Sequence, residues 1–153
     1  MPTFLRLAVL SCLCLSQQAL AGWLLAKNDC GFNIWCAGAK NDGTFTQISE
    51  VLPGQLYRSD LRANNDNIGA VVKCALNNDI QQPYQLEVAV EHGNTWLDLS
   101  AIDGDPFLQY HRRAEVKGGL CAVDCPPGSH VCEYPVTMKC QTQDDATLYL
   151  CSP

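Results

Sequence analysis

The sequence predicts an all-β protein, and three features of the chain lead to this prediction. Short apolar runs follow one another closely, separated by Gly, Pro and Asn residues, as is typical of a β-sandwich or β-barrel. Residues 84–100 alternate apolar and polar side chains with the period of a strand. No helix-length window shows apolar residues at the i, i+3, i+4, i+7 spacing of an amphipathic helix.

The composition restricts the functions that the chain can serve. Its 153 residues suit one domain, and with 47% hydrophobic and 17% charged residues it is too apolar for a disordered tail. The net charge of -6 argues against a nucleic-acid-binding protein, which needs a basic face. No apolar run reaches the roughly 18 residues that span a membrane. We therefore expect a monomeric domain with no nucleic-acid partner and no membrane partner.

Residues 1–21 have the features of a secretory signal peptide. One positive charge lies within the first six residues, an apolar run covers residues 7–15, and Ala19-Leu20-Ala21 has the small-x-small pattern of a cleavage site. Cleavage after Ala21 would release residues 22–153 as a secreted domain. The chain has no N-x-Ser/Thr sequon, so N-glycosylation is not expected.

Cleavage also removes two cysteines and leaves eight. An even number of cysteines in an oxidising compartment predicts four disulfides, but the sequence alone allows 105 pairings. A metal site of Cys125, Cys132, Cys140 and His130 is the alternative. It lacks the C-x2-C pair that zinc sites of this kind use, so we expect neither a metal nor a cofactor. The eight cysteines are Cys30, Cys36, Cys74, Cys121, Cys125, Cys132, Cys140 and Cys151.

The strand-like segments follow one another along the mature chain. Residues 118–135 differ from them, because cysteines, prolines and glycines replace the alternation, and this stretch is expected to be a disulfide-stapled loop. The predicted strands cover residues 23–26, 32–36, 45–52, 55–58, 68–76, 84–100 (a hairpin) and 147–151.

The hairpin has one apolar and one polar face. We predict Gly93-Asn94 as its two-residue turn. In that register Asp98 lies opposite Ala89 and diagonal to Glu87, with their Cβ atoms about 7–8 Å apart. The apolar face then comprises Leu86, Val88, Val90, Leu97 and Leu99, and the other face carries Glu87, Ala89, Glu91, Trp96 and Asp98.

Three segments resemble the thaumatin-like proteins. Residues 28–35 are similar to the opening pattern N-N-C-x-aromatic-x-V-W, residues 96–107 to W-Y-D-L-S-x-(I/V)-x-G-D-P-F, and residues 147–151 to the closing T-L-x-L-C. Together they are most similar to the yeast-phase-specific (Bys-type) secreted proteins of fungi. The resemblance implies a flattened β-sandwich with a disulfide-stapled C-terminal loop, and it implies that Cys30 pairs with Cys151.

The other disulfides are assigned after that pair. Cys36 and Cys74 lie in separate predicted strands and form the expected second pair. The remaining cysteines would pair among themselves. They are Cys121, Cys125, Cys132 and Cys140.

Large thaumatin-like proteins carry an acidic cleft of one arginine, one glutamate and three aspartates. By resemblance, Glu87 matches the glutamate, and Asp98 and Asp103 match two of the aspartates. The arginine has no clear counterpart, since residues 71–73 fall near its place and contain only Lys73 as a cation. The third aspartate belongs to a region that this shorter chain lacks.

Two classes of function suit these residues. A glycosidase needs two carboxyl groups roughly 5 Å apart for retention or 6.5–9.5 Å apart for inversion, and Glu87 and Asp98 fall near the second range in the predicted register. Nothing in the flanking sequence raises the pKa of a general acid, so we expect no catalytic residue. We expect instead a non-enzymatic secreted protein that binds a cell-wall glycan or a host surface protein through Glu87, Trp96, Asp98 and Asp103.

Two alternatives share the same scaffold. One is a weak β-1,3-glucan hydrolase or antifungal protein that uses the acidic cleft. The other is an inhibitor of a foreign hydrolase.

Overall fold

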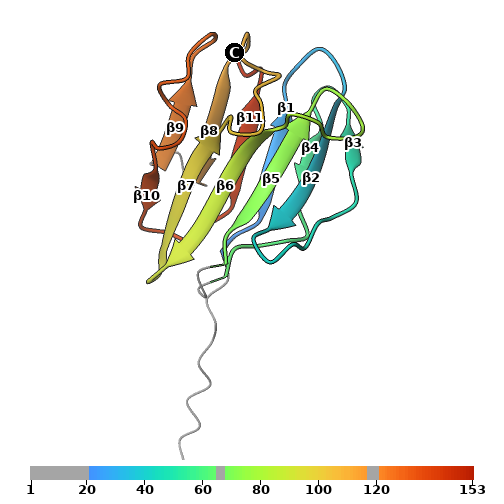
Figure 1. Ribbon diagram of the computed structural model, residues 1–153. Helices are drawn as coiled ribbons and strands as arrows, with labels where there is room; N and C mark the ends of the chain where they lie inside the picture. The colour runs from blue at the N-terminus through green and yellow to red at the C-terminus, as the bar shows by residue number, and fades with distance from the viewer. Residues whose placement is uncertain (1–20, 65–67, 117–120) are drawn as a thin grey trace, which may run out of the picture.

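The computed structural model describes residues 21–64, 68–116 and 121–153. Eleven strands in these ranges form two β-sheets packed against each other, with no helix among them (Figure 1). The predicted all-β sandwich is therefore confirmed. The described ranges contain no helix that is long and apolar enough to cross a membrane. All of the predicted signal peptide except Ala21 lies outside them.

The first sheet has five strands in the order β4-β1-β11-β8-β9. β1 and β11 pair in parallel, so the first and last strands lie side by side within the sheet (Figure 1). The other neighbours are antiparallel. The strands are β1 (Leu24–Asn28), β4 (Leu56–Arg58), β8 (Arg112–Val116), β9 (Cys121–Cys125) and β11 (Ala146–Leu150).

The second sheet has six strands in the order β10-β7-β6-β5-β2-β3, and all of its neighbours are antiparallel. Its centre is a meander of β5, β6 and β7, which carries most of the residues discussed below. The strands are β2 (Ile34–Lys40), β3 (Ser49–Val51), β5 (Ala70–Ala75), β6 (Tyr84–Glu91), β7 (Asn94–Ser100) and β10 (Met138–Cys140).

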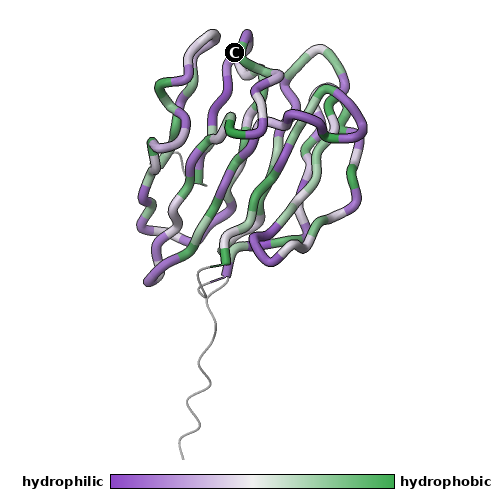
Figure 2. The backbone as a smooth tube through the Cα atoms, in the orientation of Figure 1, coloured by the Kyte–Doolittle hydropathy of each residue, from purple (hydrophilic) through white to green (hydrophobic). Residues whose placement is uncertain are grey.

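The core lies between the two sheets. Hydrophobic and hydrophilic residues alternate along the central strands, as Figure 2 shows. The apolar face predicted for the hairpin is buried, since none of its five side chains is more than 3% exposed. Burial of each such side chain contributes about 1.5–3 kcal/mol to stability. The facing sheet supplies Leu24, Ala26, Ala114, Leu148 and Leu150.

The prediction of Gly93-Asn94 as the hairpin turn is wrong, as the pairing of β6 with β7 shows. Glu91 pairs with Asn94, so the two turn residues are His92 and Gly93. Both have positive φ, 49° and 79°, which is the backbone of a type I′ turn. Histidine is among the residues that tolerate this conformation, and the Asn94 side-chain amide donates a hydrogen bond to the backbone oxygen of His92 at 3.1 Å.

The correction shifts the hairpin by two residues. Such a shift leaves every side chain on its predicted face, because the side-chain period of a strand is two. It does change the cross-strand partners. Glu87 lies directly opposite Asp98, and Ala89 lies opposite Trp96.

Two other strand predictions also need correction. β9 lies inside the stretch predicted as a loop, because it pairs along its whole length with β8; residues 117–120 are not described. Neither β8 nor β10 was predicted. β8 has the sequence RRAEV, and its inward-facing Arg112 hides the alternation of buried and half-buried positions.

Four disulfides stabilise the sandwich. The pair implied by the family resemblance, Cys30–Cys151, is present and joins residues 121 positions apart in the sequence. The expected second pair, Cys36–Cys74, is also present and links β2 to β5. The other four cysteines pair among themselves. Since all eight are oxidised, none is left as a thiolate for the alternative zinc site. The disulfides are Cys30–Cys151, Cys36–Cys74, Cys121–Cys140 and Cys125–Cys132.

Candidate functional site

A groove of about 500 Å³ lies on the face of the six-stranded sheet that points away from the core. Its floor consists of outward-facing side chains of β5, β6 and β7, and the end of β2 forms one side. Polar, charged and aromatic groups converge in it, as is typical of a binding site. The lining residues that matter below are Lys40, Lys73, Gln85, Glu87, Trp96 and Asp98.

The structure brings three of the four predicted site residues into this groove. Glu87, Trp96 and Asp98 all line it. Asp103 lies next to it, in the loop after β7. Its carboxylate accepts a hydrogen bond from Lys73 Nζ at 2.9 Å and another from Gln85 Nε2 at 3.1 Å. Asp103 therefore positions groove residues without lining the groove itself.

Glu87 and Asp98 form a pair of like charges. As a directly opposed cross-strand pair, they have Cβ atoms about 4.5–5.5 Å apart, which is closer than the diagonal arrangement predicted from the sequence. Burial, together with the smaller effect of the negative charge of Glu87, raises the pKa of Asp98 to about 7. Asp98 Oδ2 is buried and has no hydrogen-bond partner in the part of the chain that the structure describes.

The raised pKa of Asp98 corrects an expectation from the sequence. No local signal indicated an environment that would favour a protonated acid, because the burial comes from packing across strands. At neutral pH Asp98 exists as a mixture of carboxyl and carboxylate, beside the carboxylate of Glu87. The groove therefore contains a carboxyl group that can donate as well as accept a hydrogen bond.

Trp96 provides a half-buried aromatic surface in the groove. Its cross-strand neighbours are the small Ala89 on β6 and Lys139 on β10. Lys139 Nζ lies 5.5 Å from the centroid of the indole ring, within the range of a cation–π contact. Trp96 thus lies at the surface of the sheet and does not pack under a second layer.

Lys73 is a cation of the groove. It lines the groove from β5 and forms an ion pair with Asp103. Sequence analysis also missed Gln85 and Lys40 as lining residues. The alternation along β6 could have placed Gln85 on this face, but Lys40 comes from the distant end of β2, and no local pattern links it to the hairpin.

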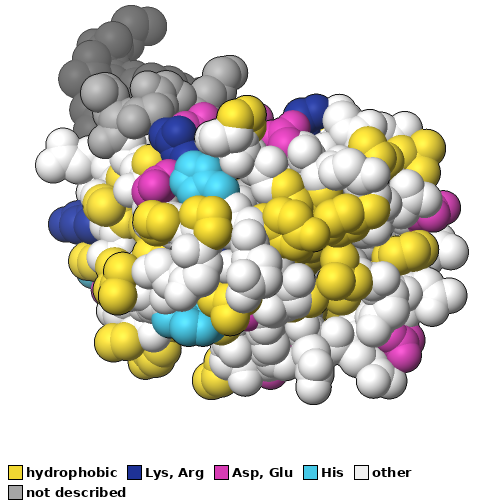
Figure 3. Space-filling model, turned by 90° about the horizontal axis from the view of Figure 1, so that it is seen from above, with side chains coloured by type: hydrophobic (Ala, Val, Ile, Leu, Met, Phe, Trp, Pro, Cys, Tyr) yellow, Lys and Arg dark blue, Asp and Glu magenta, His cyan; other side chains and the backbone are white. Residues whose placement is uncertain are grey.

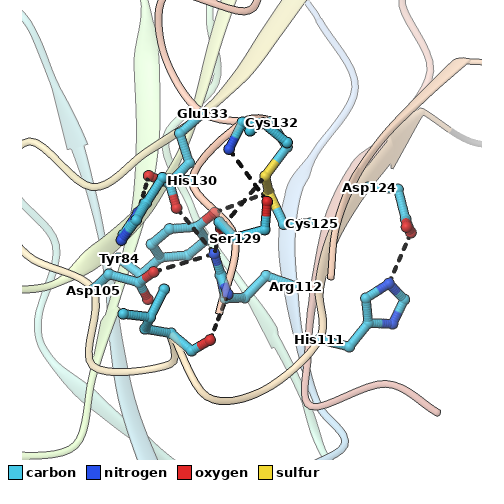
Figure 4. The surroundings of a disulfide bond; sticks show 12 residues. Tyr84, Asp105, His111, Arg112, Asp124, Cys125, Ser129, His130, Cys132 and Glu133 are labelled. Carbon is cyan, nitrogen blue, oxygen red and sulfur yellow. Dashed lines mark hydrogen bonds and ion pairs between the residues drawn. A yellow bond between two sulfur atoms is a disulfide. The ribbon is translucent and has the colours of Figure 1, made fainter. Parts of the chain in front are cut away.

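A second polar cluster lies at one end of the sandwich, around Arg112 (Figure 4). The Arg112 side chain is fully buried, and its Nη2 lies 3.0 Å from Glu133 Oε1 and 3.3 Å from Asp105 Oδ2. Burial raises the pKa of Asp105 to about 6, although the positive charge of Arg112 opposes this rise. The guanidinium also donates to the backbone oxygens of Leu108, Tyr110 and Ser129.

The Arg112 cluster has a structural role. Ligand atoms of Asp105, His130 and Glu133 lie within 4.8 Å of one another, which is close enough to hold a metal ion. The guanidinium of Arg112 already contacts both carboxylates and supplies the positive charge that an ion would bring. The cluster fastens the loop that carries the Cys125–Cys132 disulfide to β8 (Figure 4).

A third surface is formed by the loops at this end of the sandwich. Figure 3 shows hydrophobic side chains gathered there. The exposed hydrophobic residues of the loops that follow β7 and β9 include Ile102, Val131 and Tyr134. The loop after β9 is tied to β7 by a hydrogen bond from the Tyr134 amide to the backbone oxygen of Leu99. The groove combines a cavity with convergent polar and aromatic groups, so we take the groove as the candidate site.

Comparison with solved structures defines the class of protein. The fold matches the protein elicitor MoHrip2 from Magnaporthe oryzae with a TM-score of 0.75 and 18% identity, over 86% of this chain and 100% of that one. It also matches the thaumatin-like xylanase inhibitor TLXI with a TM-score of 0.59 and 15% identity, over 84% of this chain and 99% of that one. The protein therefore has the thaumatin-like fold.

Sequence comparison identifies the family. The model of the Bys1 family, described as "Blastomyces yeast-phase-specific protein", matches residues 12–152. The chain belongs to this family. It is also 27% identical over 151 residues to the "Antigenic thaumatin-like protein" of Arthroderma benhamiae. The matched region covers 90% of this chain and 77% of that relative.

Proposed function

We propose that the protein is a secreted, non-enzymatic binding protein that holds a glycan of the fungal cell wall or of a host surface in the groove. The observation that carries this proposal is the position of Trp96, whose ring lies half-buried in the groove beside Glu87 and Asp98. A sugar has polar hydroxyls and an apolar ring face. An aromatic side chain can pack on the ring face while the polar groups around it form hydrogen bonds with the hydroxyls.

Secretion is supported by three independent features. The N-terminal sequence has the pattern of a signal peptide, and four disulfides are typical of proteins that fold in an oxidising compartment. A related protein is named an antigen, and a protein of the same fold is named an elicitor. Such names suit proteins that meet a host, and we infer an extracellular or wall-associated location for this chain.

The direct test is glycan binding by the purified protein. We expect it to bind on an array of β-glucan, chitin and host-type oligosaccharides, and we expect Trp96→Ala to weaken the affinity by roughly 1–3 kcal/mol, the usual scale for loss of an aromatic anchor. Tyr134→Ala is the matched control, because Tyr134 is an exposed aromatic residue outside the groove. Equal binding by wild type and Trp96→Ala would rule out the groove as the glycan site.

Two further assays, binding to host surface proteins and inhibition of foreign glycosidases, distinguish the other partners. Binding of a host surface protein with no glycan binding would replace the glycan by a protein partner. A complex with a foreign glycosidase that stops its activity would assign an inhibitory function, of the kind that the name of the xylanase inhibitor gives for that protein.

A β-1,3-glucan hydrolase is the second candidate, and one observation favours it. Glu87 and Asp98 are directly opposed, and the pKa of Asp98 is raised to about 7, so the groove holds a protonated acid beside a carboxylate. A glycosidase uses such a pair, and the close spacing suits a retaining mechanism better than an inverting one. Release of reducing sugar from β-1,3-glucan that is lost in Glu87→Gln would establish this function and overturn the non-enzymatic proposal.

A further inference from the structure

A second pocket adjoins the groove and differs from it in charge. It has a volume of about 380 Å³ and is formed mainly by residues 60–64, which follow β4. Lys40 lines both pockets, so the two pockets adjoin at this residue. The lining residues of the second pocket are Lys40, Asp60, Leu61, Arg62 and Asn64.

Arg62 is held in place beside this pocket by an aromatic ring. Its guanidinium carbon lies 3.2 Å from the centroid of the Trp23 indole, and the guanidinium carbon of Arg58 lies 4.4 Å from the same centroid. Stacking of this kind fixes the plane of a guanidinium and leaves its N–H groups free at the edge. Both arginines therefore lose little freedom when they bind a ligand.

These two arginines differ from the other arginines of the domain in their ionic partners. Arg112 and Arg113 both form ion pairs with carboxylates. Among residues 21–64, 68–116 and 121–153, no carboxylate lies within ion-pair distance of Arg58 or Arg62. The chain has 16 acidic and 10 basic residues, so carboxylates are abundant and this arrangement is unusual.

We propose that the second pocket binds the anionic group of an acidic polysaccharide whose neighbouring sugars lie in the groove. The inference rests on the proposed glycan-binding function and names its ligand class. A guanidinium fork matches a carboxylate or a sulfate with two parallel hydrogen bonds, and Arg62 lines the pocket. Lys40 lies between the two pockets and adds a positive charge to the path of the chain.

The carboxylates of a uronic acid polymer satisfy this geometry. Each carboxylate is attached to a pyranose ring of the same chain, so in this proposal one ring packs on Trp96 and the acid of another ring further along the chain bonds to Arg62. A sulfated glycan offers the same chemistry through its sulfate esters. The mixed charges of the groove, with Lys73 paired to Asp103, do not repel such a chain as a uniformly acidic cleft would.

The experiment uses two pairs of glycans, galacturonan with its methyl ester and sulfated glucan with neutral glucan, and the members of each pair differ chiefly in charge. We would measure the affinity of the secreted protein for a hexamer of galacturonic acid, for its methyl ester and for a neutral β-glucan hexamer, with a sulfated glucan hexamer as the second anionic arm. The free acid should bind about tenfold more tightly than its ester at low salt, the scale expected for charge-assisted hydrogen bonds. Whichever anionic arm shows the larger gain identifies the source of the anion.

Variants separate this inference from the proposed function. Arg62→Gln should reduce the affinity for the acid to that for the ester and leave neutral binding unchanged, whereas Trp96→Ala should weaken binding of every glycan. Arg113→Gln is the matched control, since Arg113 is a half-exposed arginine outside both pockets. Thermal unfolding of Arg62→Gln should match that of wild type, which checks that the variant is folded.

The outcomes are distinct. Equal affinity for the acid, the ester and the sulfated glucan, with neutral binding that depends on Trp96, would overturn the anionic pocket and keep the proposed function. If Arg62→Gln and Trp96→Ala weakened the affinity for every glycan equally, the anionic pocket would also be overturned. Arg62 would then contribute to binding whether or not the glycan is charged. Absence of binding to any glycan would overturn both.

Discussion

Glu87 and Asp98 lie directly opposite each other on β6 and β7, at the floor of the groove. Like charges in such a position destabilise a sheet, and here the conflict is relieved by protonation of Asp98, whose pKa rises to about 7. A pair of carboxyl groups that is costly for the fold suggests a role for the exposed face on which it lies.

The Glu87–Asp98 pair makes stability depend on pH. The pKa of Asp98 is about 7 in the folded protein and 3.8 in the unfolded chain. Between these two pH values, the folded state therefore holds a proton that the unfolded chain releases. The free energy of unfolding should therefore be highest below pH 4 for this group and fall as the pH rises towards 7. Urea unfolding measured between pH 4.5 and about 7.5 checks this.

Asp98→Asn tests which group is responsible. The amide imitates the protonated carboxyl, so the variant should be more stable than wild type at pH 7, and its stability should fall less steeply than that of wild type between about pH 6 and 7. Asp105 titrates in the same direction with a pKa of about 6, so part of the slope at lower pH should remain. Asp60→Asn, at an exposed position, is the control, and an unchanged profile in Asp98→Asn would contradict the assignment.

Replacement of Arg112 by Met should destabilise the protein by about 3–5 kcal/mol. The substitution leaves the buried carboxylates of Asp105 and Glu133 without their cation, and an uncompensated buried charge is costly. Arg113→Met is the matched control, because its ion pair with Glu115 is partly exposed and should contribute only about 0–1 kcal/mol. Chemical denaturation of both variants gives the two values, and equal losses would contradict the buried network.

The disulfides should contribute unequally to stability. In the chain-entropy model, the Cys30–Cys151 bond constrains a loop of 121 residues and contributes about 5 kcal/mol, whereas the Cys125–Cys132 bond, with a separation of 7, contributes about 2 kcal/mol. Double Cys→Ala variants of each pair, compared by urea unfolding, measure the difference. A larger loss for the shorter loop would show that native contacts, and not loop entropy, determine the contribution.

The mass of the secreted protein tests its processing. The chain should begin at Gly22, carry no N-glycan and have a mass eight hydrogens below that of the reduced form, since four disulfides remove two hydrogens each. Intact-mass spectrometry before and after reduction measures all three properties. A start before residue 22, or a free thiol, would contradict the predicted cleavage or the oxidation of all eight cysteines.

The sequence by itself determined the architecture and the faces of the strands. Alternation from Leu86 to Val90 identified a half-buried strand, because a strand with one face in the core must repeat with a period of two. The same alternation placed Glu87, Trp96 and Asp98 on one outer face. Recognisable segments at both ends of the chain pointed to the family and to the Cys30–Cys151 bond.

Only the tertiary structure decided the partners of these residues. A register shift of two residues preserves every face, so the pattern could not distinguish Ala89 from Glu87 as the neighbour of Asp98; the backbone of the His92-Gly93 turn decided it. The raised pKa of Asp98 follows from its burial and, to a smaller extent, from that neighbour. The meeting of Lys40 with Arg62 likewise depends on packing between segments that the sequence keeps apart, because a local pattern carries no information on contacts between remote residues.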